Sequence, residues 1–381
     1  MTSDMEDVWF GIASLGNLLS IIGLVTFIIG STREREVRTS DADLVIPPAA
    51  AILGFVAIGY SFGYADGNTW LGWQGFGLAD DALTSVRLAS EVTMVGLVAL
   101  GALGGAVERS TRAAQVGVGA IIGTLALPLL VRSADVGLLS DVSVDGQTFV
   151  DPAALASRYL LLGLMGLVGA LIIGPRLGKL GPTGESRYVP GRSEAASTVA
   201  GLLIATATIV ATAGRLVAVR PATSTITIGL IAASGGLLAA VVTGYFYAGR
   251  TEGWALARSL VGGSIASTAA AATMSPLWAA VVGAVGGVLV FVADRALDSA
   301  RIDDPAGIFA MFGLPSAWGL LAVTMTSPDR GLDQLAAQMS GTLIVASWAV
   351  VISAVSFGAA RMLGVLRIGD VEEREGLSPS G

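Results

Sequence analysis

The chain is dominated by apolar runs that are each long enough to cross a lipid bilayer. A helix that rises about 1.5 Å per residue needs about 20 apolar residues to cross a hydrocarbon core about 30 Å thick. Hydrophobic residues make up 53% of the chain and charged residues only 13%. We therefore predict an all-α polytopic membrane protein with eleven transmembrane helices. The expected spans are roughly 8–30, 44–64, 85–107, 113–131, 152–174, 195–213, 225–248, 257–275, 276–293, 305–326 and 341–366.

The boundary between the eighth and ninth runs rests on a turn signal, Ser275-Pro276. The first run begins at Val8 without a basic segment before it or a small-residue cleavage site, so we expect a retained helix. These runs predict a transmembrane domain over residues 1–366 and a cytoplasmic tail over residues 367–381.

Two residue types are missing from the whole chain, because it contains no cysteine and no histidine. This excludes disulfides, thiolate chemistry, Cys/His metal sites, serine–histidine triads and imidazole proton relays. No pair of a nucleophile and a base, and no Walker or other cofactor motif, is found either. We therefore expect a protein that is not an enzyme and that holds no cofactor or metal.

Basic residues are unequally divided between the two sets of loops. Sixteen lie in or beside one set and four in or beside the other, which predicts an external N-terminus and a cytoplasmic C-terminus. The first set is Arg33, Arg35, Arg38, Arg109, Arg112, Arg176, Lys179, Arg187, Arg192, Arg250, Arg258, Arg295, Arg301, Arg361, Arg367 and Arg374. The second set is Arg132, Arg215, Arg220 and Arg330.

An Asp-Pro-Ala sequence opens two of the expected helices, at Asp151 and at Asp304. A carboxylate followed by proline is typical of a helix start. The eighth residue after the aspartate is aromatic in both copies, Tyr159 and Phe312. Eight residues descend about 12 Å along a helix, close to the middle of the bilayer, so the two aromatic rings are expected to meet there.

The loop charges place the Asp151 helix and the Asp304 helix in opposite directions. This arrangement indicates an inverted repeat of five plus five helices, with residues 8–174 and 195–326 as the repeats and 341–366 as an added helix. The alternative to a repeat is that Asp-Pro occurs twice only because it is a common helix cap.

Charged residues inside the expected spans are candidates for function. Arg158 lies beside Tyr159, and Glu91 on the third span is its expected partner. The alternative is a structural ion pair or a contact between subunits. The net charge of −7 with a single lysine, Lys179, is typical of a halophilic archaeal source and offers no basic face for nucleic acid.

Several stretches resemble the ammonium transporter (Amt/MEP/Rh) family over about residues 8–377. They are Gly59–Gly67, Gly105–Arg109, Asp151–Arg176, Asp303–Gly319 and Leu366–Leu377. The family has a pair of histidines at the middle of its pore, and the resemblance places Tyr159 and Phe312 at those two positions. It also places Met94 and Ala211 at the family's two gate positions, and Asp151 and Arg215 at the outer vestibule.

The resemblance implies passage of ammonia or ammonium, or of another small neutral solute, through a non-standard pore. The alternative is a non-conducting structural or regulatory subunit. The family is trimeric, so we expect a homotrimer, or a heterotrimer with a histidine-bearing paralogue, in the cell membrane. A PII-type signalling protein is a further expected partner at the cytoplasmic tail.

Overall fold

The computed structural model describes residues 3–33, 40–78, 85, 87–187, 189–249, 252–326 and 331–375. Four of the basic residues used to predict the orientation, Arg35, Arg38, Arg250 and Arg330, lie outside these ranges. The end of the tail motif, Gly376-Leu377, lies outside them as well.

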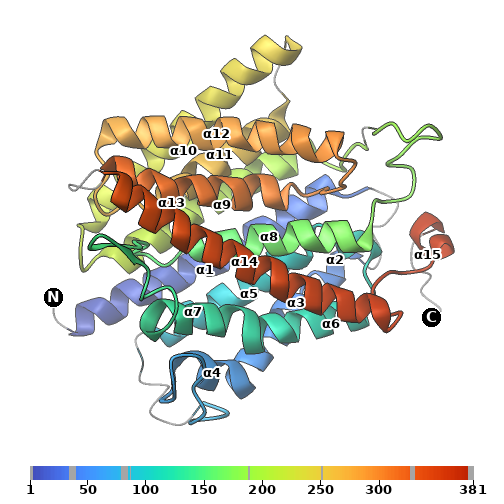
Figure 1. Cartoon of the computed structure of the whole chain (residues 1–381). Helices are drawn as coiled ribbons and strands as arrows, with labels where there is room; N and C mark the ends of the chain where they lie inside the picture. Colours follow the sequence, from blue (N-terminus) through green and yellow to red (C-terminus); the bar gives the residue numbers. More distant parts are fainter. Residues whose placement is uncertain are drawn as a thin grey trace.

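Long helices lie side by side in a single bundle (Figure 1). They are α1 (Ser3–Ser31), α5 (Leu88–Gly104), α8 (Ala156–Ile173), α9 (Glu194–Leu216), α10 (Ala222–Ala248), α11 (Gly253–Ser267), α12 (Pro276–Ser299), α13 (Leu314–Thr326) and α14 (Leu332–Met362). Two further rods contain a π-helical segment: α3 (Ile46–Gly54), η2 (Phe55–Gly59) and α4 (Tyr60–Tyr64) form one, and α6 (Arg112–Ile121), η5 (Ile122–Ala126) and α7 (Leu127–Val136) form the other. A third π-helical segment, η6 (Phe309–Gly313), leads into α13.

The remaining elements are short and lie at the ends of the bundle. They are α2 (Ser40–Asp43), the 3-10 turn η4 (Val107–Arg109), α15 (Asp370–Glu375), and the hairpin of β1 (Ser143–Val144) and β2 (Gln147–Thr148). In this antiparallel hairpin, Ser143 lies opposite Thr148.

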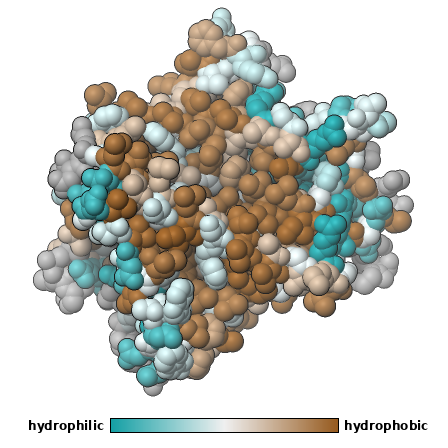
Figure 2. Space-filling model, viewed as in Figure 1, coloured by the Kyte–Doolittle hydropathy of each residue, from teal (hydrophilic) through white to brown (hydrophobic). Residues whose placement is uncertain are grey.

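The surface seen in Figure 2 is apolar across the middle of the bundle, with hydrophilic residues gathered toward its two ends. Within the described ranges, nine helical segments are long and apolar enough to cross a membrane. The other two expected spans correspond to shorter helices, α5 and α11. The chain is therefore a multi-pass helical membrane protein, and the number eleven stays a prediction.

Some expected boundaries were wrong. The eighth span was expected to reach residue 275, but α11 ends at Ser267, and residues up to Met274 form turns such as Met274 N–H to Ala270 O. Ser275 then caps α12, because its hydroxyl accepts a hydrogen bond from the Trp278 amide. The last helix begins at Leu332 rather than 341 and ends at Met362.

The two ends of the bundle are defined here by their residues. The end that carries Arg33, Arg109, Arg176 and Arg367 is the inner end, and the end that carries Glu91, Asp151 and Arg215 is the outer end. Arg176, in the loop after α8, forms an ion pair with Asp303, just before η6. The last turn of α8 and the first turn of η6 therefore lie at the same end of the bundle. The helices that follow the two Asp-Pro sequences are therefore antiparallel. In Figure 1, α1 starts at one end of the bundle and α15 lies at the other.

The antiparallel pair is closest at Gly163 of α8. A Cβ atom added there would lie 2.2 Å from the Gly313 amide nitrogen and 2.4 Å from the Gly313 Cα. Both neighbours are backbone atoms, which cannot rotate away. This approach brings α8 against η6 at the level of the two aromatic residues.

We expect Gly163→Ala to destabilise the protein by about 1–3 kcal/mol, because the helices must separate. The matched control is Gly117→Ala on α6, where an added Cβ meets nothing within 4 Å. Thermal unfolding of both variants in the same detergent is the measurement. Equal unfolding midpoints for the two variants would contradict the close contact.

Candidate functional site

Tyr159 and Phe312, the two aromatic residues expected at the family's histidine positions, are in contact. The Tyr159 and Phe312 ring centroids are 5.8 Å apart with an interplanar angle of 38°. Tyr159 is 0% exposed and Phe312 is 1% exposed. An aromatic contact of this kind stabilises the packing of the two rings by about 0.5–1.5 kcal/mol beyond burial alone. The contact joins the two antiparallel helices at one level of the bundle.

Matching turns position these rings. In each turn the third residue after the aspartate has positive φ, at Ala154 (51°) and at Gly307 (66°). The amide of that residue donates to the aspartate carbonyl, at 2.8 Å in the first turn and 3.0 Å in the second. The same turn therefore occurs in both halves of the chain.

These turns correct the expected helix starts. The left-handed residue ends the turn before a helix can begin, so α8 starts at Ala156 and η6 at Phe309. The aspartates still cap the helices from a distance. Asp151 accepts hydrogen bonds from the Ser157 amide and hydroxyl, and Asp304 accepts them from the amides of Ile308 and Phe309.

The expected 12 Å descent from each aspartate does not hold, because the residues after it are not helical. Tyr159 lies in the first turn of α8, and Phe312 lies inside the π-helical segment η6. The rings still meet because both helices start five residues after their aspartates, so both rings are displaced in the same way.

The residues expected to line the middle of a pore are closely packed. Met94, at an expected gate position, is 0% exposed, as are its neighbours Leu97 and Val98 on α5. A side chain with no exposed surface touches no space large enough for water, and ammonia is about the same size. The structure therefore has no water-sized space against Met94 or Tyr159.

The other expected gate position packs against a neighbouring helix. Ala211 faces α1, since a Cβ atom at Gly16 would lie 3.0 Å from the Ala211 Cβ. Thr208, one helical turn earlier on α9, is the polar residue that faces Tyr159. The two hydroxyls interact with each other, and neither has a further hydrogen-bond partner among the described residues. The sequence pattern gave no signal that singled out Thr208.

The outer end holds a buried cluster of one carboxylate and two guanidinium groups. Arg158 Nη1 lies 2.9 Å from Glu91 Oε2, and Arg215 Nη2 lies 3.0 Å from Glu91 Oε1. Arg215 also donates to the Ser90 hydroxyl and to the Ala153 carbonyl, both at 2.7 Å. One carboxylate shared by two guanidinium groups leaves the cluster with one net positive charge.

Asp151 lies beside this cluster, in the turn before α8. Burial raises the pKa of its carboxyl, and the hydrogen bonds from Ser157 oppose that rise. Its Oδ1 atom has no hydrogen-bond partner within the described ranges. Its contacts are those of a helix-capping residue.

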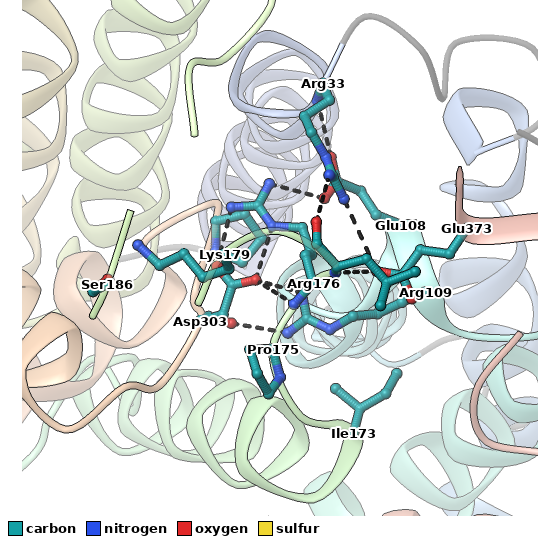
Figure 3. A network of polar contacts seen from close by, with 12 residues as sticks. Arg33, Glu108, Arg109, Ile173, Pro175, Arg176, Lys179, Ser186, Asp303 and Glu373 are labelled. Carbon is teal, nitrogen blue, oxygen red and sulfur yellow. Dashed lines mark hydrogen bonds and ion pairs between the residues drawn. The ribbon is translucent and has the colours of Figure 1, made fainter. Parts of the chain in front are cut away.

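A second buried network closes the inner end (Figure 3). Arg176 donates from Nε and Nη2 to Asp303 at 2.8 and 3.0 Å, and from Nη1 to Glu108 at 2.9 Å. Arg109 donates to the Asp303 carboxylate and carbonyl at 3.2 and 2.8 Å. The sequence motifs contained all four residues, but their spacing along the chain did not predict this network.

The tail is held to the same end of the bundle. The Glu373 carboxylate accepts from the Leu177 amide at 2.7 Å and from Arg367 at 2.7 Å. Arg367 also donates to the carbonyls of Ile173 and Pro175, both at 2.9 Å. These contacts fix the tail against the loop after α8, beside the Arg176 network in Figure 3.

The inner network makes stability depend on pH through Asp303. Burial opposes the charge of this carboxylate, but Arg176 and Arg109 outweigh burial and lower the pKa of Asp303 to about 2 from 3.8. A lowered pKa in the folded state gives stability that is present above pH 4 and lost as the pH falls toward 2. A shift of this size corresponds to about 2 kcal/mol.

We expect Asp303→Asn to lower the unfolding midpoint at pH 6, and the gap from the unmodified protein to narrow as the pH falls from 4 to 2. Thermal unfolding of both proteins across this pH range tests the expectation. A gap that stays constant or widens toward pH 2 would show that Asp303 is not held ionised by its partners.

Taken together, the helical bundle and its apolar surface define a polytopic helical membrane protein. The chain matches the Ammonium Transporter Family over residues 8–380, and it belongs to that family. Members of this family are transporters rather than enzymes, and membership supports transport of ammonium or ammonia.

Relatives and solved structures agree with this family. The ammonium transporter Amt1 of Haloferax mediterranei is 33% identical over 61% of this chain, and the match spans 48% of that protein. The putative ammonium transporter sll1017 of Synechocystis is 26% identical over 86% of this chain and 76% of its own length. A solved chain described as a sensor Amt protein has a TM-score of 0.90 at 20% identity, covering 99% of this chain and 98% of its own. Mep2 of Saccharomyces cerevisiae has a TM-score of 0.81 at 20% identity, covering 97% and 88%.

Proposed function

We propose that this protein passes ammonia, or another small uncharged solute, through a pore that excludes the ammonium ion. The proposal combines family membership with a midplane that has aromatic rings and hydroxyls in place of two histidines. The observation that carries it is the pair of buried hydroxyls, on Tyr159 and Thr208, which face each other and have no further hydrogen-bond partner among the described residues.

Two buried hydroxyls that interact only with each other leave hydrogen-bonding positions unused, and each unsatisfied group costs about 1–3 kcal/mol. A solute with an N–H group and a lone pair can satisfy both hydroxyls as it passes. A tyrosine hydroxyl donates and accepts hydrogen bonds, but its ordinary pKa near 10 makes it a poor proton relay at neutral pH. The proposed solute therefore crosses without leaving a proton on the site.

Exclusion of the ammonium ion follows from the charges and from the apolar surroundings. At the outer end, Glu91 is already paired with both Arg158 and Arg215, so its carboxylate is not free to bind an ammonium ion. Beyond it, the aromatic rings offer a cation only contacts of about 1–2 kcal/mol, far less than the hydration it would lose.

The test is the rate of ammonia entry into proteoliposomes that contain only this protein and a pH-sensitive dye. We expect entry above that of empty liposomes, and a decrease of about tenfold in Tyr159→Phe/Thr208→Val, since one lost hydrogen bond is worth about 1.4 kcal/mol. The matched control is Thr324→Val, which removes another buried unpartnered hydroxyl, twelve residues past Phe312 along η6 and α13. Equal rates in the double variant and the unmodified protein would contradict the role of the hydroxyls.

A second candidate, a non-conducting structural or regulatory subunit, is favoured by the direct contact of the Tyr159 and Phe312 rings. It predicts no entry above empty liposomes. Entry that is absent in the unmodified protein but present in Tyr159→His/Phe312→His would identify a transporter silenced at these two positions.

For the assembly, we propose a trimer in the cell membrane with the outer end outside the cell. This proposal rests on the family resemblance and on the distribution of basic residues. A heterotrimer with a histidine-bearing paralogue is excluded if the purified native complex contains this chain alone. Binding of a PII-type protein at the tail is tested by co-purification with and without residues 367–381.

A further inference from the structure

A cavity of about 640 Å³ opens at the inner end, between the ends of α1, α9, α11 and α12 and the turn before η6. Gly30 and Ser31 of α1 line it, as do Asp304 and Pro305 of the turn. Phe27 lies one turn earlier on the same side of α1 and is 0% exposed. The cavity therefore ends between Ser31 and Phe27.

Arg258 lies at that boundary. It was counted among the loop arginines, but it belongs to α11 and is 8% exposed. It lines the cavity, and its guanidinium carbon is 5.9 Å from the centre of the Phe27 ring. It also lies over the Trp254 ring, at 4.8 Å. The guanidinium group is therefore in contact with two aromatic rings.

Two hydrogen bonds hold Arg258 in this place. Nη1 donates to Asp294 of α12 at 2.8 Å, and Nη2 donates to the Pro305 carbonyl at 2.8 Å. The second bond ties the arginine to the turn that leads into η6 and Phe312. A guanidinium group is planar and carries several N–H donors in a fixed geometry, so it can bond to both partners at once.

The turn is shaped around the arginine. A Cβ atom at Gly307 would lie 2.4 Å from the Arg258 Cζ and 2.5 Å from its Nε. Gly307 also has a φ of +66°, which favours glycine. The space at the end of the cavity is therefore filled by the guanidinium group.

We propose that Arg258 is a plug at the inner mouth of the path, in series with the Tyr159–Phe312 contact. Its guanidinium group separates the cavity from Phe27, and a solute passes between the cavity and the midplane only when Arg258 leaves Asp294 and Pro305. The identity of that solute rests on the function proposed above, but the plug itself can be tested without any measurement of transport.

The chain has no cysteine, so a single introduced thiol can be followed without background. The test uses Phe27→Cys in detergent and measures its rate of modification by methyl methanethiosulfonate, a small uncharged reagent. We expect the rate to rise at least tenfold when Arg258→Ala is added. The matched control is Arg295→Ala, which removes another arginine that lines the same cavity and lies against Tyr247 and Phe291 instead.

The same rate with and without Arg258 would overturn the proposal, and so would an equal acceleration by Arg295→Ala. Because Arg258→Ala leaves Asp294 without its partner, Arg258→Gln/Asp294→Asn serves if the first variant does not fold, with the same acceleration expected. Acceleration of labelling in a protein that shows no ammonia entry would keep the plug and reject the proposed function.

Discussion

Arg176→Ala is expected to destabilise the protein by about 3–5 kcal/mol, enough to remove most of the folded fraction of a marginally stable protein. Arg176 is the shared partner of two buried carboxylates, Glu108 and Asp303. Without it, both carboxylates stay buried and Asp303 keeps only Arg109. Burial lowers the pKa of the Arg176 guanidinium, but the two carboxylates outweigh burial and raise this pKa, so the group stays charged.

The matched control for this substitution is Arg187→Ala. Arg187 forms an ion pair with Glu185, and both side chains are about half exposed. Exposed pairs contribute little, so we expect a change below about 1 kcal/mol. The measurement is the folded yield after size-exclusion chromatography together with the thermal midpoint in detergent. Similar losses for the two variants would show that the inner network does not hold the bundle together.

Glu91→Gln is the second substitution for which we expect a large effect, a decrease of about 3–5 kcal/mol in the free energy of unfolding. The substitution leaves Arg158 and Arg215 buried next to each other with no carboxylate between them. Arg215→Gln is expected to cost clearly less, because it leaves Glu91 and Arg158 as a neutral pair. Removing the one carboxylate is therefore expected to lower the free energy of unfolding more than removing one of the two arginines. This order is specific to a carboxylate that two arginines share.

Thermal unfolding of Glu91→Gln, Arg215→Gln and the control Glu185→Gln in one detergent measures the order. Glu185 is exposed, so its substitution leaves no buried charge behind. An equal loss for Glu91→Gln and Arg215→Gln would contradict the shared carboxylate.

Local patterns were enough to predict the helices and the contact between the two aromatic rings. Apolar runs of the right length gave a helix in each expected place, and the repeated Asp-Pro-Ala sequence pointed to the partnership of Tyr159 with Phe312. The helix starts were wrong because a positive φ at Ala154 and Gly307 delays each helix. Glycine at 307 is compatible with such a turn, whereas alanine at 154 does not predict one.

The polar networks depend on contacts between distant residues, which periodicity does not reveal. Arg176 and Asp303 are separated by 127 positions. Glu91 was expected to pair with Arg158, but its second partner, Arg215, was assigned only to the outer mouth. Arg258 lies near the start of an apolar run, and only the packing of α11 against the turn at Pro305 shows that it is buried.

The proposed pore admits an uncharged solute and excludes the ammonium ion. To test this, one ammonium gradient is applied to identical proteoliposomes, and the internal pH and the electrical current are recorded in parallel. We expect the internal pH to rise faster than in empty liposomes, with no current above background. A current that increases with ammonium concentration would contradict it.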